Sequence, residues 1–599
     1  MALTQLSSSR RRAGERVDSS PIPVTSVPVT SINANAFSMP PANIPGMQAY
    51  DTAYDTVHDA VNNPAWPADC AGIFPVSRPG TVSELIEALR EPACYPHPVA
   101  SVVVKQTHIS WVLLAGTYAY KIKKPVRFGF VDFSTLERRR QACEDELRLN
   151  RRFAPTLYVD VVAIHGTAAR PIFEPRSAPI EYAVRLHRFD TEQELGALLA
   201  RDAVTCEELN VFGQQLAQLQ EGCPVYSTAG MAQRSQATVA ANLDELLAET
   251  SARPEDPGGL QPLAEVARWL RDWAAGCAAA LERRAALGRV RECHGDLHVG
   301  NVVRFEGRLT AFDCLEFDIS LRRIDVLDDA AFLFMDLVAR GRRDLAYAFL
   351  NGWLERAGDY EAIGLLGYFF VHRALVRVKV LLLGGEPGEA RRYLDAARIL
   401  VQGSRAVLVL TCGLSGSGKT WLSERVMAAA GAIRIRSDVE RKRMAGLQAD
   451  QSSLQAGIDI YTSAFNDRVY ERLLHLAGEQ LRAGQSVIVD AAFLKQAERH
   501  RFSALADELD VPLVLLHCVA PAEELGRRLS ARQRAGKDAS EADEAVMLRQ
   551  VHAWEPFAEF ERGAVIEVDT RAPGAAARVA ARIVNLQAEA SSDRKTVKP

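Results

Sequence analysis

Apolar positions in the last third of the chain fall into short runs of strand length, and these runs are separated by segments with helical periodicity. The strand-like runs lie at 405–412, 432–436, 486–490, 512–519 and 565–569. Parallel strands need a crossover connection, which is usually a helix. The alternation therefore predicts an α/β domain, a doubly wound parallel sheet with helices on both faces.

The preceding region starts with a different pattern, in which strand-like runs follow one another closely. These runs lie at 102–105, 110–114, 118–123, 157–164 and 180–187. Gly116 and Thr117 fit a two-residue hairpin turn between the second and third runs. The pattern predicts a small β-rich lobe.

Helical periodicity dominates the rest of that region. The expected helical segments lie at 81–89, 135–152, 190–290 with a Pro/Gly break at 254–259, and 322–402. Thr81 or Ser83 could cap the first of these helices. A helical lobe is therefore expected to follow the β-rich lobe.

These patterns divide the 599 residues into four segments. Residues 1–65 are rich in Ser, Pro, Asn, Thr and Ala and lack periodicity, so we expect a disordered tail. An α+β domain at 75–402 and an α/β domain at 403–585 follow, with a flexible tail at 586–599. Little linker separates the two domains near residue 402, so we expect them to pack together.

The composition of the chain limits the cellular locations and the binding partners that we expect for it. The 71 basic and 75 acidic residues nearly cancel, so the overall charge favours neither a membrane surface nor nucleic acid as a partner. No apolar run reaches the length of about 18 residues expected of a membrane span. The 10 cysteines form no C-x-x-C pair, which is typical of reduced thiols in a cytoplasmic protein.

A glycine-rich phosphate-binding motif, G-x-x-x-x-G-K-[ST], follows the first strand of the α/β domain and precedes a helix, as its chemistry requires. The residues that would surround the phosphates of ATP are Gly413, Ser415, Gly416, Ser417, Gly418, Lys419 and Thr420. Lys419 would reach the β- and γ-phosphates, and Thr420 would bind Mg²⁺. Asp490, at the end of a strand, is a second candidate for the Mg²⁺ site, or it positions the acceptor instead.

A second phosphate-transfer motif lies in the α+β domain. His294-Gly295-Asp296 is followed by Asn301, five residues after the aspartate, and then by Asp313. Protein kinases have the same spacing, in which one carboxylate orients and deprotonates a hydroxyl while an amide and a second carboxylate hold Mg²⁺. Two unrelated phosphate sites on one chain make phosphoryl transfer the leading hypothesis.

This motif, with Thr107–Val112, Asp132–Arg140 and Arg323–Leu327, resembles the aminoglycoside phosphotransferase and choline kinase group, and it is closest to a bacterial family in which such a domain is fused to a P-loop domain. The resemblance implies a protein-kinase-like bilobal fold for the α+β domain. It implies that Asp296 is the catalytic base, that Asn301 and Asp313 hold Mg²⁺, and that His294 braces the loop. Asp318 or Asp328 would support the site from outside.

A kinase lobe also needs a lysine on its third strand to hold the phosphates of ATP, and a glutamate on the next helix to pair with it. Lys121 fits the V-A-I-K pattern, and Lys123 lies on the same face of the strand and stays an alternative. The glutamate is Glu144 or Glu146, and the resemblance favours Glu146. No G-x-G-x-x-G loop is present, so the turn at 107–110 would cover the phosphates.

Acceptor binding in the α/β domain is the least specified part. Asp438 resembles the acceptor-side aspartate of P-loop kinases such as gluconate kinase, and it would be a base unless it caps a helix. Arg441 and Arg443 would grip an anionic substrate. Further arginines would act from a lid on the transferring phosphate, with Arg528 and Arg532 the chosen ones; the other candidates are Arg499, Arg527 and Arg534.

These observations predict a bifunctional enzyme that uses ATP and Mg²⁺ to phosphorylate a hydroxyl in each half. The expected acceptors are small molecules, and in the second half an anionic or phosphorylated molecule or a nucleotide or RNA hydroxyl. Two alternatives stay open: a regulatory protein in which one ATP site controls the other half, and a nucleic-acid end kinase. The charge balance argues against the last of these.

Overall fold

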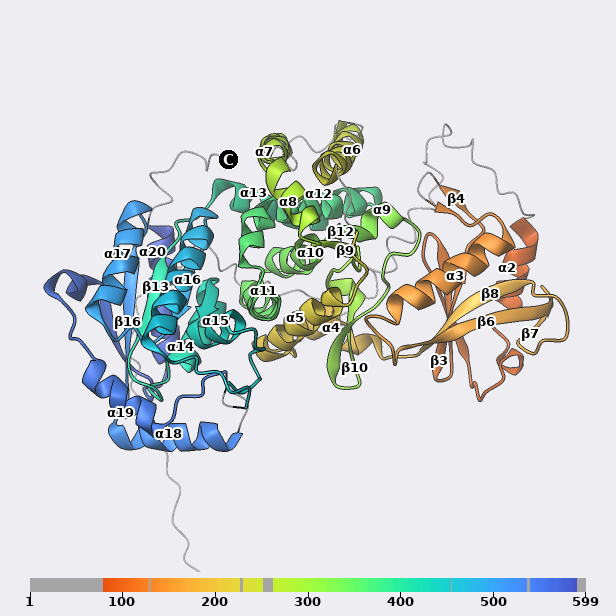
Figure 1. Ribbon diagram of the computed structural model, residues 1–599. Helices are drawn as coiled ribbons and strands as arrows, with labels where there is room; N and C mark the ends of the chain where they lie inside the picture. Colours follow the sequence, from red (N-terminus) through yellow and green to blue (C-terminus); the bar gives the residue numbers. More distant parts are fainter. Residues whose placement is uncertain are drawn as a thin grey trace, which may run out of the picture. The chain divides into compact units, whose positions relative to one another are not determined.

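The computed structural model describes residues 79–128, 131–226, 230–251, 262–453, 455–535 and 539–589, all within one compact unit of the chain. The first sheet has the strand order β1-β2-β3-β8-β6-β7 and is antiparallel. Figure 1 labels β3, β8, β6 and β7 of this sheet. Its strands are β1 (Val102–Gln106), β2 (Ser110–Ala115), β3 (Tyr118–Lys123), β6 (Tyr158–Thr167), β7 (Arg170–Ile172) and β8 (Glu181–His187). Helix α3 (Leu136–Asn150) contacts β3, β6 and β8.

The expected hairpin in this lobe is confirmed. The register of β2 and β3 runs from Ser110 opposite Lys123 to Ala115 opposite Tyr118, which leaves Gly116 and Thr117 as the turn. Gly116 has a φ of 60°, and a Cβ there would lie 2.6 Å from the carbonyl oxygen of Pro98. Both the backbone conformation and the close approach therefore favour glycine.

The helical lobe follows, with two short two-stranded antiparallel sheets inserted among its described helices. Its main helices are α5 (Cys206–Glu221), α6 (Met231–Ser251), α7 (Leu263–Gly276), α8 (Ala278–Ala286), α10 (Val326–Ala339), α11 (Arg343–Ala357), α12 (Leu366–Leu383) and α13 (Pro387–Gln402). The strands are β9 (Val290–Glu292) with β12 (Arg323–Asp325), and β10 (Val302–Phe305) with β11 (Arg308–Ala311). Helix α10 is buried along most of its length and lies at the centre of this lobe.

The second sheet is wholly parallel and has the order β14-β15-β13-β16-β17. Its strands are β13 (Leu408–Cys412), β14 (Ile433–Arg436), β15 (Val487–Asp490), β16 (Leu513–Val519) and β17 (Val565–Asp569). The helices that connect them are α14 (Lys419–Ala430), α15 (Ser437–Met444), α16 (Ser463–Arg482), α17 (Gln496–Glu508), α18 (Ala522–Ala535) and α19 (Glu544–Ala553) (Figure 1). All five predicted strands are present, and the doubly wound parallel sheet is confirmed.

The helical lobe and the second sheet share one hydrophobic core. A single cluster of buried residues includes Phe349 and Trp353 of α11 together with Val426 of α14 and Ile433 of β14. Helix α11 contacts both α14 and β14. The expected packing of the two domains is therefore confirmed.

Two expectations about the ends of elements differ from the structure. Helix α2 spans Pro79–Ala88, so Thr81 and Ser83 lie inside it and neither precedes it as a cap. Helix α20 runs from Ala575 to Ala588, and Gln587 is buried there, so the C-terminal tail cannot begin at residue 586. The predicted N-terminal tail at 1–65 and the break at 254–259 lie outside the described residues. Among the described helices, none is both long and apolar enough to cross a membrane.

Candidate active sites

Asp296 lies in the loop between β9 and a 3-10 turn, η5 (Val299–Asn301). The side-chain amide of Asn301 donates to the carbonyl oxygen of Asp296 at 2.9 Å and to its carboxylate at 3.1 Å. His298 accepts the N–H of Gly300 at its Nδ1, so its Nε2 carries the proton that faces the Asp296 carboxylate at 3.5 Å. The structure thus brings the predicted base and the predicted amide ligand together.

The electrostatic surroundings of Asp296 favour a carboxylate. Burial raises the pKa of this group, but the attraction and hydrogen bond of His298 outweigh burial, helped by Arg377, and hold the pKa below its ordinary value. The side chain is still 40% exposed, so an acceptor can reach it. The carboxylate is therefore ionised and accessible at neutral pH.

Buried aspartates of α10 hold the backbone of this loop. Asp329 accepts from the N–H groups of His294 and Gly295, at 3.1 and 2.9 Å. Asp336 accepts from the N–H of Val299 at 2.8 Å. Sequence reasoning missed both, although an acidic residue on an otherwise apolar helix is a visible signal, because a buried carboxylate needs partners.

Of the two aspartates proposed as outer support, Asp328 contacts the loop through Arg373. Arg373 pairs with Asp328 at 2.7 Å and donates to the carbonyl oxygen of Gly295 at 3.2 Å. Asp318 instead precedes the short helix α9 (Ile319–Arg322) and accepts from the N–H of Ser320. This geometry favours Asp328 over Asp318 for the supporting role.

A buried ion network joins the β-rich lobe to the second half of the motif. Lys121 contacts Asp313 at 2.5 Å and Glu146 at 3.0 Å. Lys123, whose side chain is fully buried, contacts the other oxygen of Glu146 at 2.5 Å and also pairs with Glu316. Burial raises the pKa of Glu146, but the two lysines outweigh burial and lower it to about 2. Glu146 is therefore ionised, whereas burial raises the pKa of Glu316 above its ordinary value.

The two lysines of the network have different ion-pair partners. Lys121 is the one that bridges the helix glutamate and Asp313, whereas Lys123 bridges the same glutamate and Glu316. Glu144 is half-exposed and lies near Arg140, at 3.6 Å. The geometry favours Lys121 and Glu146 for the phosphate-binding pair.

Asp313 has a strained backbone. Its φ is 60°, in the left-handed region that residues other than glycine seldom adopt. Its N–H donates to the hydroxyl of Tyr158 at 3.1 Å, and that contact helps to hold the conformation. Strain of this kind is often kept at functional positions.

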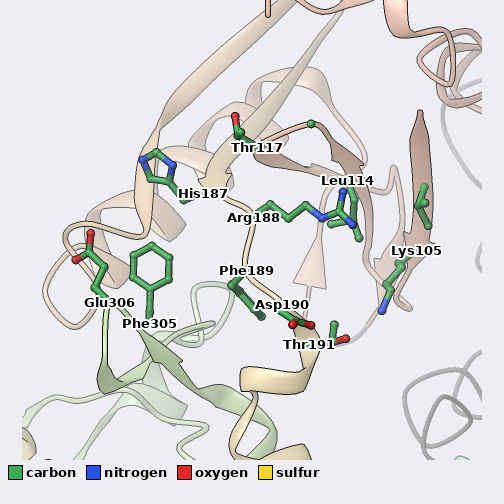
Figure 2. A pocket seen from close by; sticks show the side chains of 12 residues that line it. Lys105, Leu114, Thr117, His187, Arg188, Phe189, Asp190, Thr191, Phe305 and Glu306 are labelled. Carbon is green, nitrogen blue, oxygen red and sulfur yellow. The ribbon is translucent and has the colours of Figure 1, made fainter. Parts of the chain in front are cut away.

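A cavity of about 750 Å³ is lined by residues of the β-rich lobe, of the segment after β8 and of the end of β10, and no residue of the ion network is among them (Figure 2). Leu114 lines it and lies opposite Ala119 in the sheet, so Leu114 points to the same face as Lys121, two residues further on. Phe189, in the segment after β8, and Phe305, at the end of β10, also line the cavity. A cavity on the lysine face of the sheet that offers apolar side chains (Leu114, Phe189, Phe305) together with polar and charged ones (Lys105, Arg188, Asp190) suits a flat, polar nucleotide base.

The glycine-rich loop of the second domain joins β13 to α14. Gly413, Gly416 and Gly418 have φ values of 131°, 83° and 92°. A Cβ on Gly413 would lie 2.6 Å from the carbonyl oxygen of Cys518, so this position requires glycine. Lys419 donates to the carbonyl oxygens of Gly413 and Leu414, at 3.0 and 2.9 Å, and burial lowers its pKa.

Most of the predicted residues of the second site line one cavity of about 350 Å³. They are Ser415, Gly416, Gly418, Lys419, Thr420, Asp438, Arg441, Asp490, Arg528 and Arg532. Gly413 and Ser417 belong to the loop but do not line the cavity. Sequence reasoning missed Arg436 and Lys495, which also line it and which no motif marks.

Asp490 and Asp438 lie at the carboxyl ends of neighbouring strands. Asp490 is buried and accepts from the hydroxyls of Ser423, at 2.9 Å, and Thr411, at 3.4 Å. Asp438 lies in the first turn of α15, whose N-cap is Arg436. The alternative in which Asp438 is the N-cap of this helix is therefore wrong.

The structure sorts the arginine candidates. Arg528 of α18 donates to the carbonyl oxygen of Gly416 and to the hydroxyl of Thr570, which places it against the glycine-rich loop. Arg532 donates to the carbonyl oxygen of Ala542 at 2.5 Å and lines the cavity. Arg527 and Arg534 do not line the cavity.

Two other arginines are structural. Arg499 is fully buried and pairs with Glu561 at 2.7 Å, so its candidacy for the transferring phosphate is wrong. Arg443 pairs with Glu440 and donates to the carbonyl oxygen of Glu355 in the helical lobe. Arg443 does not line the cavity, so the expectation that it grips a substrate there is wrong.

Comparison with known proteins agrees with this division. Residues 119–366 match the profile described as the phosphotransferase enzyme family, and residues 408–557 match one described as an AAA domain. The chain is therefore a fusion of a phosphotransferase domain with a P-loop domain of the kinase-like type, which confirms the predicted fold class and the predicted resemblance.

Mycobacterial proteins are similar to this chain over most of its length. Uncharacterized protein Mb2027c of Mycobacterium bovis and Uncharacterized protein Rv2004c of Mycobacterium tuberculosis are each 28% identical over 474 residues, which is 77% of this chain and 93% of theirs. The similarity thus extends over both domains of the fusion.

Among solved structures, a sugar kinase from Janibacter sp. HTCC2649 is 22% identical, with 31% of this chain and 97% of that chain covered and a TM-score of 0.24. A gluconokinase from Sinorhizobium meliloti 1021 is 20% identical, with coverage of 32% and 95% and a TM-score of 0.23. These similarities are too low to bear on the activity of this chain.

Proposed function

We propose that the protein is a bifunctional phosphotransferase, in which each domain transfers the γ-phosphate of ATP to a hydroxyl group. The observation that carries the proposal is the arrangement in the first domain. An ionised, accessible Asp296 is hydrogen-bonded to Asn301, and Lys121 joins Glu146 to Asp313 on the face of the sheet where Leu114 lines a cavity of about 750 Å³. Phosphoryl transfer needs this combination of positioning and charge more than it needs covalent chemistry.

The donor groups of the first site suit Mg²⁺. Asn301 uses its amide nitrogen for Asp296, so its amide oxygen is the atom left for a metal, and Asp313 supplies a carboxylate. Oxygen ligands of these two kinds are those that Mg²⁺ prefers. When bound with ATP, Mg²⁺ would neutralise charge on the phosphates.

In the proposed reaction, Asp296 orients the acceptor hydroxyl and takes its proton. The acceptor oxygen forms a bond to the γ-phosphorus, and the bond between that phosphorus and the oxygen of the leaving ADP breaks. Lys121, held in place by Glu146, would balance negative charge on the phosphates. The ionised state of Asp296 fits a positioned acceptor of a proton better than a strong base.

In the second domain, the glycine-rich loop and the N-terminus of α14 would bind the phosphates through backbone N–H groups, and Lys419 would add a positive charge. Thr420 and Asp490 are the hydroxyl and carboxylate that suit Mg²⁺ there, and both line the cavity. Arg528 and Arg532, from α18, would stabilise charge on the transferring group. Asp438 would take the proton of the acceptor hydroxyl.

The lining of the second cavity supports an anionic small-molecule acceptor. Arg441 is buried and lines the cavity; its terminal nitrogens donate to Ile460 and Asn466, at 2.9 and 2.7 Å, and its Nε is without a hydrogen-bond partner among the described residues. Two further cationic residues, Arg436 and Lys495, line the same cavity. Two carboxylates, those of Asp438 and Glu498, line it as well. A guanidinium binds carboxylate or phosphate through paired donors, so we propose an acceptor that carries one of these groups. We also propose a cytoplasmic location, where ATP and reduced thiols occur together.

The test is transfer of labelled γ-phosphate from ATP to a pool of small hydroxyl compounds by the full chain. We expect two groups of labelled products, one lost in Asp296→Asn and the other in Lys419→Ala. The acceptor half of the second site is tested by Asp438→Asn, which should abolish the second group while ATP binding stays within a few-fold. Labelling of neither group, with ATP bound at both sites, would contradict catalysis and favour the regulatory alternative.

A further inference from the structure

The open edge of the second sheet is covered by a helix of the phosphotransferase domain. Strand β14 is at the edge of the sheet, and no other strand of the described part of the chain pairs with its outer backbone groups. The side-chain amide of Asn351, on α11, replaces one: it accepts the N–H of Arg434 at 2.6 Å and donates to the carbonyl oxygen of Ala432 at 2.9 Å. A single buried amide therefore pairs with the strand as a peptide group would.

One turn further along α11, Glu355 contacts the side chains that leave the same strand. It pairs with Arg436 at 2.8 Å and with Arg434 at 3.4 Å. Burial raises the pKa of Glu355, but the two arginines outweigh burial and lower it, so the carboxylate is charged. Arg436 is the N-cap residue of α15, two residues before Asp438, and it lines the second cavity.

The far end of α15 is also held by α11. Arg443 donates to the carbonyl oxygen of Glu355, in the last turn of α11, and packs over Gly358, which ends that helix. A Cβ on Gly358 would lie 2.6 Å from the Nε of Arg443, so the close approach depends on glycine. A cation at the C-terminus of a helix is favourable because it faces the negative end of the helix dipole.

The short helix that carries Asp438 and Arg441 is thus held at both ends by α11 of the other domain. We propose that α11 supports the acceptor site of the P-loop domain by fixing the position of α15, and that Glu355 is a positioning residue for Asp438. The inference rests on the proposed function, in which Asp438 faces the acceptor. It makes the phosphotransferase domain necessary for the second activity, even though none of its described residues lines the second cavity.

The test uses the full chain and the variant Glu355→Gln, which keeps the shape of the side chain and removes its charge. The matched control is Glu361→Gln, because Glu361 also faces the P-loop domain, from an exposed position 3.8 Å from Arg472. Hydrogen–deuterium exchange would be followed at 437–444 and, for comparison, at 419–430. Turnover would be measured as the part of Mg²⁺-dependent ATP hydrolysis that Lys419→Ala abolishes, with water in place of the acceptor hydroxyl.

We expect Glu355→Gln to speed exchange at 437–444 and to lower Lys419-dependent hydrolysis by about tenfold, with nucleotide affinity within about twofold of wild type. Glu355→Asp should restore part of the rate, and the control should change neither measurement. Unchanged exchange at 437–444, unchanged hydrolysis, or an equal loss of nucleotide binding would overturn the inference. Normal hydrolysis in Asp438→Asn, with faster exchange in Glu355→Gln, would instead refute the role of Asp438 in the proposed function.

Discussion

The two phosphate sites of this chain are built in opposite ways. In the phosphotransferase domain, charged side chains from a strand, a helix and a distant loop converge, and the contact between Lys121 and Asp313 joins residues 192 positions apart. In the P-loop domain, eight consecutive residues form the loop that would surround the phosphates, and the positive φ angles of its glycines set the shape of that loop. The comparison teaches that one site depends on charge and tertiary packing, and the other on local backbone geometry.

The largest effect should come from the base of the charge-built site. Asp296→Asn keeps the size of the side chain but cannot accept a proton, so transfer by the first domain should fall by about 10²–10⁴-fold. Nucleotide binding to that domain should persist. Labelled-phosphate transfer and calorimetric binding measure the two quantities, with Asp318→Asn, at the partly exposed N-cap of α9, as the control. Wild-type turnover in Asp296→Asn would show that the base is another group.

In the P-loop site, Lys419 carries the charge within the glycine-rich loop, and a single substitution removes that charge. Lys419→Ala should lower turnover of the P-loop domain by about 10²–10³-fold, comparable to the loss of a group that stabilises transition-state charge. The first domain should keep its rate, because its own lysine and aspartates are unchanged. Assays of both activities on the same variant measure this. An equal loss in both domains would mean that the sites are coupled, as in the regulatory alternative.

The two lysines of the first site should respond differently. Lys123→Met leaves Glu316 buried without its partner, so we expect a loss of about 3–5 kcal/mol in the free energy of unfolding. Lys121→Met should chiefly weaken use of ATP, because Lys121 is the lysine that reaches Asp313. Denaturant unfolding and nucleotide titration of both variants separate these outcomes. If Lys123→Met removed ATP binding at unchanged stability, the assignment of the two lysines would be reversed.

A smaller effect is expected in the helical lobe, where the free energy of unfolding should depend on pH through a buried histidine. Burial, with Arg373 beside it, lowers the pKa of His372 to about 3. The unfolded chain binds a proton near pH 6.5 and the folded chain does not, so stability is lost as the pH falls from 6.5 towards 3. The loss should reach about 2 kcal/mol at pH 5.

His372→Gln should flatten this part of the stability curve, as measured by denaturant unfolding between pH 7 and pH 4. The exposed His475→Gln is the matched control and should follow the wild-type curve. A wild-type protein that is equally stable at pH 7 and pH 5 would contradict the assignment of a buried, neutral His372.

Local patterns were sufficient for most elements and for one site. The apolar runs of the P-loop domain predicted all five strands of its sheet, since each buried parallel strand is a nearly continuous apolar run. The glycine-rich loop could be recognised because its chemistry lies in consecutive residues. The turn at Gly116 and Thr117 was predictable for the same reason.

Tertiary structure decided what depends on distant neighbours. Lys121 and Lys123 lie on the same face of one strand, and only the positions of Asp313 and Glu316 distinguish them. The sequence likewise offers Arg441 and Arg443 as equals, two residues apart, yet one lines the cavity and the other binds the helical lobe. A sequence determines which groups a chain carries and how its local segments fold, whereas the partner of a long charged side chain is set by packing between segments far apart in the chain.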